Sequence, residues 1–483
     1  MKARNLLFIL SDEHRRDITG CHGNALVKTP HLDALAARGV RFDHAYCNCP
    51  ICVPSRASLA TGRYVHDVRC WDNAHPYDGA IRGWGHRLIE AGHEVAAVGK
   101  LHYRTVDDQT GFSEEINTLH VVDGVGDLLG LLRHELPERR NVRKLAEDAG
   151  RGESTYTHYD RSIVQGAKAW LEAKASRPPD QPWLLFVGFV LPHFPLVAPP
   201  EFFDLYPLDR VPLPRFLDPD ERPTHPVLQA LRGCMNYEDY FDEERIRTAI
   251  AAYYGMVSFL DHNIGQLLQV LDDTGLAADT RVIYTSDHGD NLGNRGFWGK
   301  SLMYEEAVGV PLIMAGDDIP VGKVAKTPVS LVDLHPTFIE ALGEQLTKEE
   351  EALPGRSLFE LARQEDPGRV VFSEYHAVGA TAGMYMLRRG RWKYVHYVGH
   401  RPQLFDLEAD PQEGTDLGES SAHAAIRAEL EAELRRIVDP DAVNAQAFAD
   451  QEAKIKAHGG EAAIKARGDF GYTPAPGQTP VFG

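Results

Sequence analysis

Hydrophobic positions follow two patterns in the first two-thirds of the chain. Continuous apolar runs, such as residues 5–10 and 182–192, are typical of strands that are buried on both faces of a parallel sheet. Between the runs, apolar residues recur at helical spacing, as in residues 243–275. This alternation predicts an α/β sandwich with a mostly parallel central sheet. The other predicted elements are strands at 93–100, 281–290 and 310–317, a helix at 29–39 and a helix within 329–343.

The pattern changes near residue 368. Residues 369–397 predict short strands separated by turn residues, and an amphipathic helix begins near Ser420. The change indicates a smaller second unit that contains an antiparallel sheet. The predicted division is an α/β unit at 1–368, a C-terminal unit with a small antiparallel sheet and a helix at 369–468, and a tail at 469–483.

Charge and composition exclude several classes of protein. The 483 residues include 51 Lys and Arg and 70 Asp and Glu, which gives a formal net charge of −19. A surface this acidic repels nucleic acids and anionic membranes. The apolar run near the N-terminus is too short for a signal peptide, and no run reaches the ~20 apolar residues of a membrane span. These features predict a cytoplasmic protein whose six cysteines form no disulfide framework.

One cysteine stands at the predicted start of a helix. The segment "ICVPSRASLATGRY" at 51–64 has helical apolar spacing, with Pro54 in the first turn and Gly62 as the stop signal. Cys52 is then at the helix N-terminus, where free amides and the helix dipole favour anions and lower the pKa of a thiol. A buried, unreactive cysteine is the alternative interpretation of this segment alone.

Polar residues that can bind a metal follow two of the predicted strands. Asp12 and Glu13 follow the first strand, and Asp287 and His288 follow a later apolar strand directly. Ligands of α/β sheets bind beyond the carboxyl ends of the strands. Three carboxylates and an imidazole at such ends predict a divalent metal site, with calcium favoured by the oxygen ligands and manganese as the alternative because of the imidazole. Each residue alone is also compatible with a turn or a helix cap.

Positive and imidazole groups gather at the same kind of position. A lone lysine is usually a solvated surface group, but several such groups at strand ends, together with a metal, form a pocket for a tetrahedral anion. The sequence therefore predicts an anion-binding site beside the metal. Its candidate residues are Lys100 and His102 after one strand, His193 after another, Lys300 after the acidic segment, and Arg56 one turn into the helix of Cys52.

The segment "CVPSRASLATGR" resembles the signature of the type I sulfatases, C-x-P-S-R followed by T-G-R. The resemblance extends over nearly the whole chain and includes "GKLH", "PHFP", "DHGDNLG", "PGRSLFEL" and "LFDLEADPQE". It implies the fold of the alkaline phosphatase superfamily and the hydrolysis of sulfate esters. In this family a maturation enzyme oxidises the cysteine to formylglycine, whose hydrated aldehyde is the nucleophile.

The resemblance assigns the nucleophile and the metal site. Cys52 becomes formylglycine, and Arg56 supports it. Asp12, Asp287 and His288 bind the metal. A hydrated aldehyde suits sulfate transfer because it can release sulfate by collapsing back to the aldehyde, whereas a thiolate would leave a stable thiosulfate ester. The implied cofactors are therefore a divalent metal and a formylglycine made by a maturation enzyme.

The resemblance also assigns the groups that act on the ester. Lys100 and Lys300 bind the sulfate oxygens. His102 assists breakdown of the sulfated intermediate, and His193, together with Lys300, assists departure of the alcohol. Histidine suits these proton transfers because its ordinary pKa lies near neutrality.

Some positions depart from the commonest sulfatase pattern. Glu13 completes an Asp-Glu pair where many sulfatases have Asp-Asp, and His288 stands where many have Asn. The segments "CWDNAHPYDG" and "SEYHAVGATAGMYMLRRGRWKYVHY" resemble the branch that holds choline sulfatases and phosphonate monoester hydrolases. This resemblance makes Asn73 an active-site residue, and we take Glu374 and His376 as candidate substrate-binding residues.

The predicted function is hydrolysis of small organic sulfate monoesters, aryl or alkyl, with choline sulfate among the candidates. Phosphonate monoesters and phosphodiesters are the alternative, because their tetrahedral groups are alike. Lys100 and His102 favour sulfate monoesters, since the phosphonate hydrolases do not share this Lys-x-His. A non-catalytic binding protein with the same fold is a third alternative, but the presence of every motif residue disfavours it.

The tail at 469–483 carries Phe470, Tyr472 and Phe482 among glycines and prolines. Exposed aromatic rings are unfavourable, so we expect the tail to pack against a protein surface. In the branch that this chain resembles, C-terminal segments often reach a neighbouring subunit. We therefore predict a dimer or tetramer in which the tail crosses an interface near a substrate entrance, beside Glu374 or His376.

Overall fold

The centre of the molecule is an eight-stranded sheet in the computed structural model, which describes residues 2–177 and 179–483. Strand order is β11-β2-β10-β9-β1-β7-β4-β5, and all neighbours run parallel except β10, which is antiparallel to both β9 and β2. The predicted mostly parallel sheet is confirmed. Its strands are β1 (Asn5–Asp12), β2 (Gly39–Phe42), β4 (Glu94–Lys100), β5 (Glu114–Leu119), β7 (Trp183–Pro192), β9 (Thr280–Ser286), β10 (Leu312–Ala315) and β11 (Lys323–Ala325).

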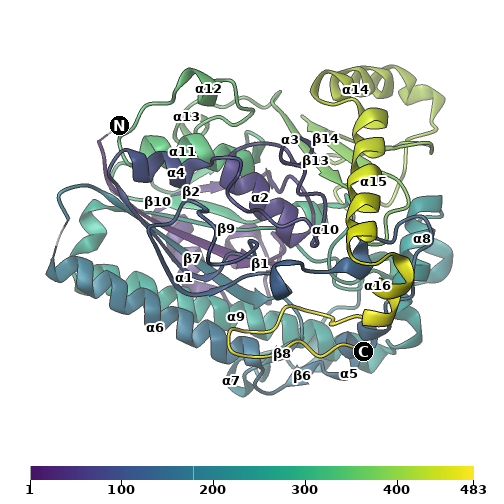
Figure 1. The fold of residues 1–483 in the computed structure, drawn as a ribbon, viewed down its shortest axis with the longest axis horizontal. Helices are drawn as coiled ribbons and strands as arrows, with labels where there is room; N and C mark the ends of the chain where they lie inside the picture. The colour runs from purple at the N-terminus through teal and green to yellow at the C-terminus, as the bar shows by residue number, and fades with distance from the viewer. Residues whose placement is uncertain (1, 178) are drawn as a thin grey trace.

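Helices cover both faces of this sheet (Figure 1). Side chains of β1 alternate between two hydrophobic clusters: Phe8 packs with α2, α4 and α11, and Ile9 packs with α1, α6 and α9. This burial on both faces explains why the strand is a continuous apolar run. The helices are α1 (Pro30–Ala37), α2 (Cys52–Thr61), α4 (Trp84–Glu90), α6 (Thr155–Ser176), α9 (Glu243–Asp273) and α11 (Leu334–Ala341).

A second, four-stranded antiparallel sheet follows, as predicted. Its strands pair in chain order as β13 (Val370–Tyr375), β14 (Met384–Arg389), β15 (Trp392–Tyr397) and β16 (Gln403–Asp406). The helix predicted near Ser420 is α14 (Ala424–Ile437), and α15 (Pro440–Ala457) and α16 (Glu461–Arg467) come after it. The division at residue 368 stays a prediction.

Short elements connect these parts. Among the described residues, no helix is long and apolar enough to cross a membrane. The remaining strands are β3 (Ala45–Tyr46), β6 (Gly150–Arg151), β8 (Val197–Ala198) and β12 (Val329–Ser330), and the remaining α-helices are α3 (Val65–Val68), α5 (Arg143–Glu147), α7 (Pro200–Phe203), α8 (Pro226–Met235), α10 (Glu305–Val308), α12 (Lys348–Glu351) and α13 (Leu358–Arg363).

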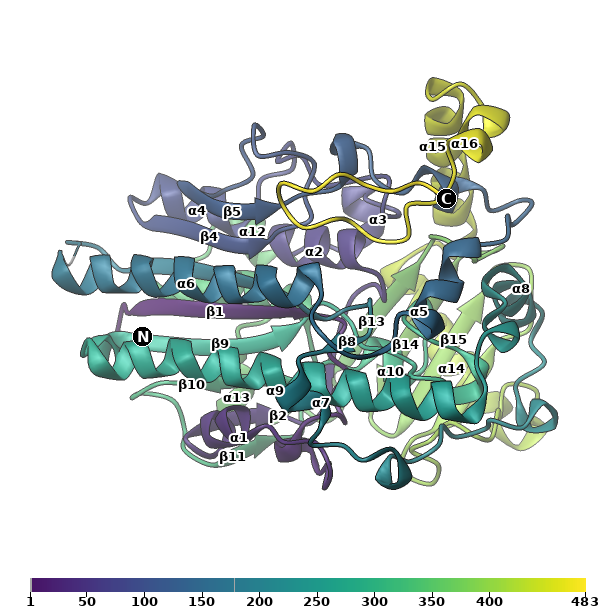
Figure 2. The same ribbon diagram turned by 90° about the horizontal axis from the view of Figure 1, so that it is seen from below.

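The tail leaves α16 as a loop and returns to its own start (Figure 2). The backbone N–H of Gly483 donates to the carbonyl of Asp469 at 2.9 Å, which closes the loop. Residues 469–473 line a cavity of the same chain. The tail therefore packs against its own chain, whereas the sequence predicted contact with a neighbouring subunit; that interface stays a prediction.

Candidate active site

Cys52 is the first residue of α2 and is buried at the carboxyl end of the sheet. Its Sγ lies 3.2 Å from Nε2 of His288 and 3.5 Å from Nζ of Lys300. Gly62 ends the helix in the left-handed region, at φ 68°, as the sequence predicted. The expected lowering of the thiol pKa is wrong: burial, with Asp12 beside it, raises the pKa of Cys52 to about 11. The unmodified thiol is therefore not an activated nucleophile.

The predicted metal residues come together because β1 and β9 are neighbours. Ser11 pairs with Ser286, so Asp12 and Asp287 leave the sheet side by side. One ligand atom from each of Asp12, Cys52, Asp287 and His288 lies within 4.8 Å of all the others. All four residues are buried. Two carboxylates and an imidazole are a suitable donor set for a divalent cation.

Arg56 balances the two acidic groups of this cluster. Its Nε donates to Oδ2 of Asp287 at 2.7 Å, and its Nη2 lies 3.5 Å from Oδ2 of Asp12. The side chain is buried one turn into α2. Although burial opposes its charge, the pKa of Asp12 lies well below its ordinary value because Lys100, His193 and Arg56 surround it. Asp12 is therefore an anionic donor at neutral pH.

Glu13 approaches the same place from the loop after β1. Its backbone is left-handed, at φ 70°, and its Oε2 accepts from Nζ of Lys300 at 2.9 Å. Its Oε1 is buried without a hydrogen-bond partner among the described residues. Burial raises the pKa of Glu13 to about 8. Glu13, Asp12 and His193 form a second set of donors within 4.8 Å, so a cation at this place would satisfy the unpaired oxygen.

Two lysines and two histidines surround the cluster. Lys100, the last residue of β4, contacts Asp12 through Nζ, and Lys300 contacts both Glu13 and Cys52. His102 and His193 follow β4 and β7, as predicted. Burial and the nearby lysines lower the pKa of both imidazoles well below the ordinary value. Both rings are therefore neutral around pH 7.

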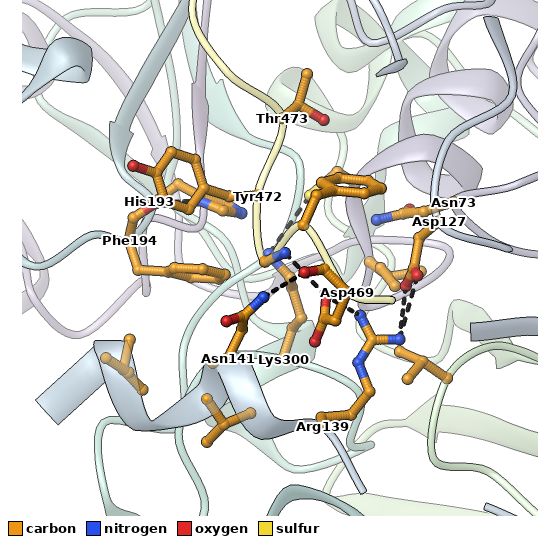
Figure 3. A pocket seen from close by; sticks show the side chains of 18 of the residues that line it. Asn73, Asp127, Arg139, Asn141, His193, Phe194, Lys300, Asp469, Tyr472 and Thr473 are labelled. Carbon is orange, nitrogen blue, oxygen red and sulfur yellow. Dashed lines mark hydrogen bonds and ion pairs between the residues drawn. The ribbon is translucent and has the colours of Figure 1, made fainter. Parts of the chain in front are cut away.

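A cavity connects Cys52 to an outer wall that the sequence did not predict. Asn73 lines it, and its Oδ1 accepts from the N–H of Val53 at 3.2 Å. Figure 3 shows the outer wall, in which Asp469 lies between Asn141 and Arg139. Contacts between residues more than 300 positions apart leave no periodic signal in a sequence. The aromatic content of the tail was the one available indication of this wall.

Glu374 and His376 do not belong to the lining of this cavity, and their assignment as substrate-binding residues stays a prediction. Both are buried on β13 and its end, and neither belongs to the cavity lining. Glu374 accepts from Nδ1 of His66 at 2.8 Å and pairs with Nε2 of His376 at 3.1 Å. Burial opposes its charge, but His66 and His376 lower the pKa of Glu374 to about 2. These residues form a buried polar network that joins β13 to α3.

A cavity lined by lysines and histidines, next to the metal-type cluster of Asp12, Cys52, Asp287 and His288 at the carboxyl end of a mostly parallel sheet, is the arrangement expected of a hydrolase of the alkaline phosphatase superfamily. The sulfatase family profile matches residues 4–344, and the profile of the N-sulphoglucosamine sulphohydrolase C-terminal region matches residues 293–439. The chain belongs to the sulfatase family and is a sulfuric ester hydrolase.

Two curated relatives match most of the chain. A choline-sulfatase of Rhizobium meliloti (strain 1021) is 32% identical over 451 residues, covering 89% of this chain and 85% of the relative. Arylsulfatase K of Xenopus laevis is 32% identical over 469 residues, covering 91% of this chain and 83% of the relative. Both names place this chain among the sulfatases.

Solved structures confirm the fold. The phosphonate monoester hydrolase of Agrobacterium radiobacter superposes with a TM-score of 0.74 at 24% identity, covering 90% of this chain and 95% of that chain. A phosphonate monoester hydrolase from Silicibacter pomeroyi superposes with a TM-score of 0.70 at 26% identity, covering 90% and 94%. The predicted alkaline phosphatase-type architecture is therefore confirmed.

Proposed function

We propose that the protein hydrolyses small organic sulfate monoesters, with a formylglycine derived from Cys52 as nucleophile. The observation that carries the proposal is the environment of Cys52. Its Sγ is close to Lys300, His288 and, at 3.6 Å, Oδ1 of Asp12, while its own thiol is not ionised. Formylglycine supplies a hydrated aldehyde as the nucleophile. Because Cys52 is buried, we expect a maturation enzyme to act before the chain has folded.

The chain's own side chains suit the remaining roles. Lys100 and Lys300 face the cavity and neutralise the sulfate oxygens, an effect that is strong in a buried site. Neutral His102 exchanges a proton with the nucleophile. His193, with Lys300, assists departure of the alcohol: the ammonium group of Lys300 can supply the proton, and the Nδ1–H of His193 donates to the carbonyl of Phe194 at 2.7 Å, which fixes the ring.

Asp12, Asp287 and His288, with Glu13 beside them, would hold the metal. Calcium fits the carboxylate oxygens, and manganese is the alternative because an imidazole is present. A bound cation would neutralise charge on the sulfate group. Oε1 of Glu13, which has no hydrogen-bond partner within 2–177 and 179–483, supports this arrangement because it is a buried acceptor next to the cluster.

Sulfate monoesters are expected to be better substrates than phosphonate monoesters. Lys100 and His102 both line the cavity, and they are the feature that favours sulfate. With one shared leaving group, as in 4-nitrophenyl sulfate and 4-nitrophenyl phenylphosphonate, we expect kcat/KM for the sulfate to exceed that for the phosphonate at least ~10-fold. A higher kcat/KM for the phosphonate would establish the alternative function. Choline sulfate and sugar sulfates, tested in the same series, would then identify the leaving alcohol.

We also propose a cytoplasmic homo-oligomer to which the tail contributes. Val481 and Phe482, near the tail's end, are 70% and 36% exposed, which leaves apolar surface for a neighbouring subunit. Truncation after Gly468 is expected to lower the mass in solution and to reduce kcat/KM about 10–100-fold, because the cavity loses one wall. Light scattering and kinetics on the full and truncated chains test both parts. A monomeric full chain would refute the oligomer, and unchanged kcat/KM would refute the role in the cavity.

A further inference from the structure

The tail places one hydroxyl group against a residue of the reaction centre. Oγ1 of Thr473 lies 2.9 Å from Nε2 of His102, although the two residues are 371 positions apart. Both side chains are buried, and both line the cavity. The backbone of His102 adopts the left-handed conformation, with φ 62°. The contact is therefore a specific one inside the site rather than a surface contact of a free chain end.

Several interactions fix the tail at this place. The Asp469 carboxylate pairs with Nη2 of Arg139 at 3.2 Å, and Arg139 also pairs with Asp127 at 3.0 Å. Asn141 donates to the carbonyl of Asp469. Arg139, Asn141 and Asp127 all line the outer wall of the cavity (Figure 3). Buried, charge-assisted hydrogen bonds of this kind hold a segment in one position.

Aromatic packing fixes the same segment from the other side. The hydroxyl of Tyr156 donates to the carbonyl of Thr473, and the rings of Tyr156 and Tyr472 are 5.2 Å apart. The ring of Phe194 lies 5.9 Å from that of Tyr472. The backbone of Thr473 and the ring of the preceding Tyr472 are thus both fixed, so the hydroxyl of Thr473 has a defined place relative to His102.

The two nitrogens of His102 have different surroundings. Nε2 contacts Thr473, whereas Nδ1 is buried and finds no hydrogen-bond partner within the part of the chain that the structure describes. Burial, together with Lys100, lowers the pKa of His102 well below its ordinary value, so the ring is neutral. A neutral imidazole carries one proton, and the hydroxyl of Thr473 can either donate to Nε2 or accept from it. A proton on Nδ1 would be a buried donor without an acceptor among the described residues, whereas a proton on Nε2 is satisfied by Thr473, so the geometry favours Nε2–H.

We propose that Thr473 is a positioning residue of the sulfatase reaction: its hydroxyl accepts a hydrogen bond from Nε2–H of His102 and leaves the lone pair on Nδ1. This inference rests on the proposed role of His102 as the group that exchanges a proton with the nucleophile. Thr473 neither forms nor breaks a covalent bond in this role. The C-terminal tail then belongs to the reaction centre and does not merely cover it.

The first test observes the ring itself in the unmodified Cys52 protein, so it does not depend on maturation. Full-length protein labelled with ¹⁵N at histidine gives ring spectra in which protonated and unprotonated nitrogens are distinct, and His102→Asn assigns the signal among the 22 histidines. We expect the Nε2–H tautomer in the natural protein and in Thr473→Ser. In Thr473→Val, which has a similar shape without a hydroxyl, we expect a mixture of tautomers. An Nδ1–H tautomer in the natural protein, or no change in the valine variant, would overturn the inference.

The second test uses the matured enzyme and an aryl sulfate. Thr473→Val is expected to lower kcat about 10–100-fold with little change in KM, and Thr473→Ser is expected to restore most of the activity. Thr479→Val is the matched control, because Thr479 also precedes a proline in the tail but is exposed. Equal losses in the valine and serine variants would mean that Thr473 acts through packing, which contradicts the proposal.

A double-mutant comparison distinguishes failure of this inference from failure of the proposed role of His102, on which it rests. In the His102→Asn background, Thr473→Val is expected to have no further effect on kcat, because the two residues act through one interaction. If His102→Asn alone leaves kcat unchanged, the proposed role of His102 fails, and the inference fails with it. If His102→Asn lowers kcat and Thr473→Val does not, the inference alone is wrong.

Discussion

Cys52→Ser is expected to abolish sulfate ester hydrolysis, with a loss of at least ~1,000-fold in kcat, because it removes the precursor of the proposed nucleophile. The unmodified thiol is not expected to substitute for it. With its pKa raised to about 11 by burial, only about one thiol in ten thousand is ionised at pH 7. Protein made without a maturation enzyme should therefore be as inactive as the variant.

Peptide mass spectrometry measures the fraction of Cys52 that is converted to formylglycine, and this fraction can be compared with kcat. In preparations with different degrees of maturation, kcat per molecule should rise in proportion to the fraction of Cys52 present as formylglycine and extrapolate to zero at zero conversion. Cys49→Ala is a suitable control, because Cys49 is equally buried and only three positions away but lies outside the metal-type cluster. Full activity in unconverted protein would show that another group is the nucleophile.

The sequence predicted which residues gather at one edge of the sheet, because the ends of parallel strands meet there. Asp12 and Asp287 are far apart in the chain, yet each directly follows a buried apolar strand, and β1 and β9 are adjacent. The sequence could place both residues at one edge without the strand order, since every such end faces the same side of the sheet, whereas their close approach depends on β1 lying beside β9. The same reasoning placed Lys100 and His193 correctly.

Side-chain direction within a strand was not predictable in this way. Glu374 lies on β13 and His376 follows just after its end, and the sequence does not say which face of that strand looks towards the cavity. In the structure the Glu374 carboxylate contacts both His66 and His376, which satisfies its charge in a buried place. The family resemblance suggested this segment, but it did not indicate that the two side chains would contact each other rather than line the cavity.

Burial was the second effect that local sequence could not supply. A helix N-terminus lowers the pKa of an exposed thiol, but Cys52 is buried beside Asp12, and these effects dominate. The outer wall depended likewise on long-range contacts, above all the pairing of Arg139 with Asp469. In both cases the decisive residues lie far apart in the sequence, and no periodic pattern indicates how close they come in space.

Removal of the metal is expected to abolish turnover, and Asp287→Asn should have nearly the same effect, with a loss of at least ~100-fold in kcat. Asp287 belongs to the donor cluster and accepts from Nε of Arg56 at 2.7 Å and from the N–H of Glu13 at 3.1 Å. An amide in its place removes one negative charge beside the cation while Arg56 stays. Glu13→Gln should cost much less, because Glu13 is joined to Lys300 through one oxygen.

Metal content distinguishes loss of a ligand from loss of a catalytic group. After chelation and reloading with calcium or manganese, elemental analysis should give about one ion per chain for the natural protein and for Asp290→Asn. Asp290 is a fitting control because it is a buried carboxylate three positions after Asp287 that bonds loop N–H groups and lies outside the cluster. Asp287→Asn should retain little metal, and a bound ion should raise the natural protein's stability by about 2.7 kcal/mol at 100 times its Kd. Equal loss of metal in Glu13→Gln would establish Glu13 as a full ligand, whereas undiminished metal in Asp287→Asn would place the cation elsewhere.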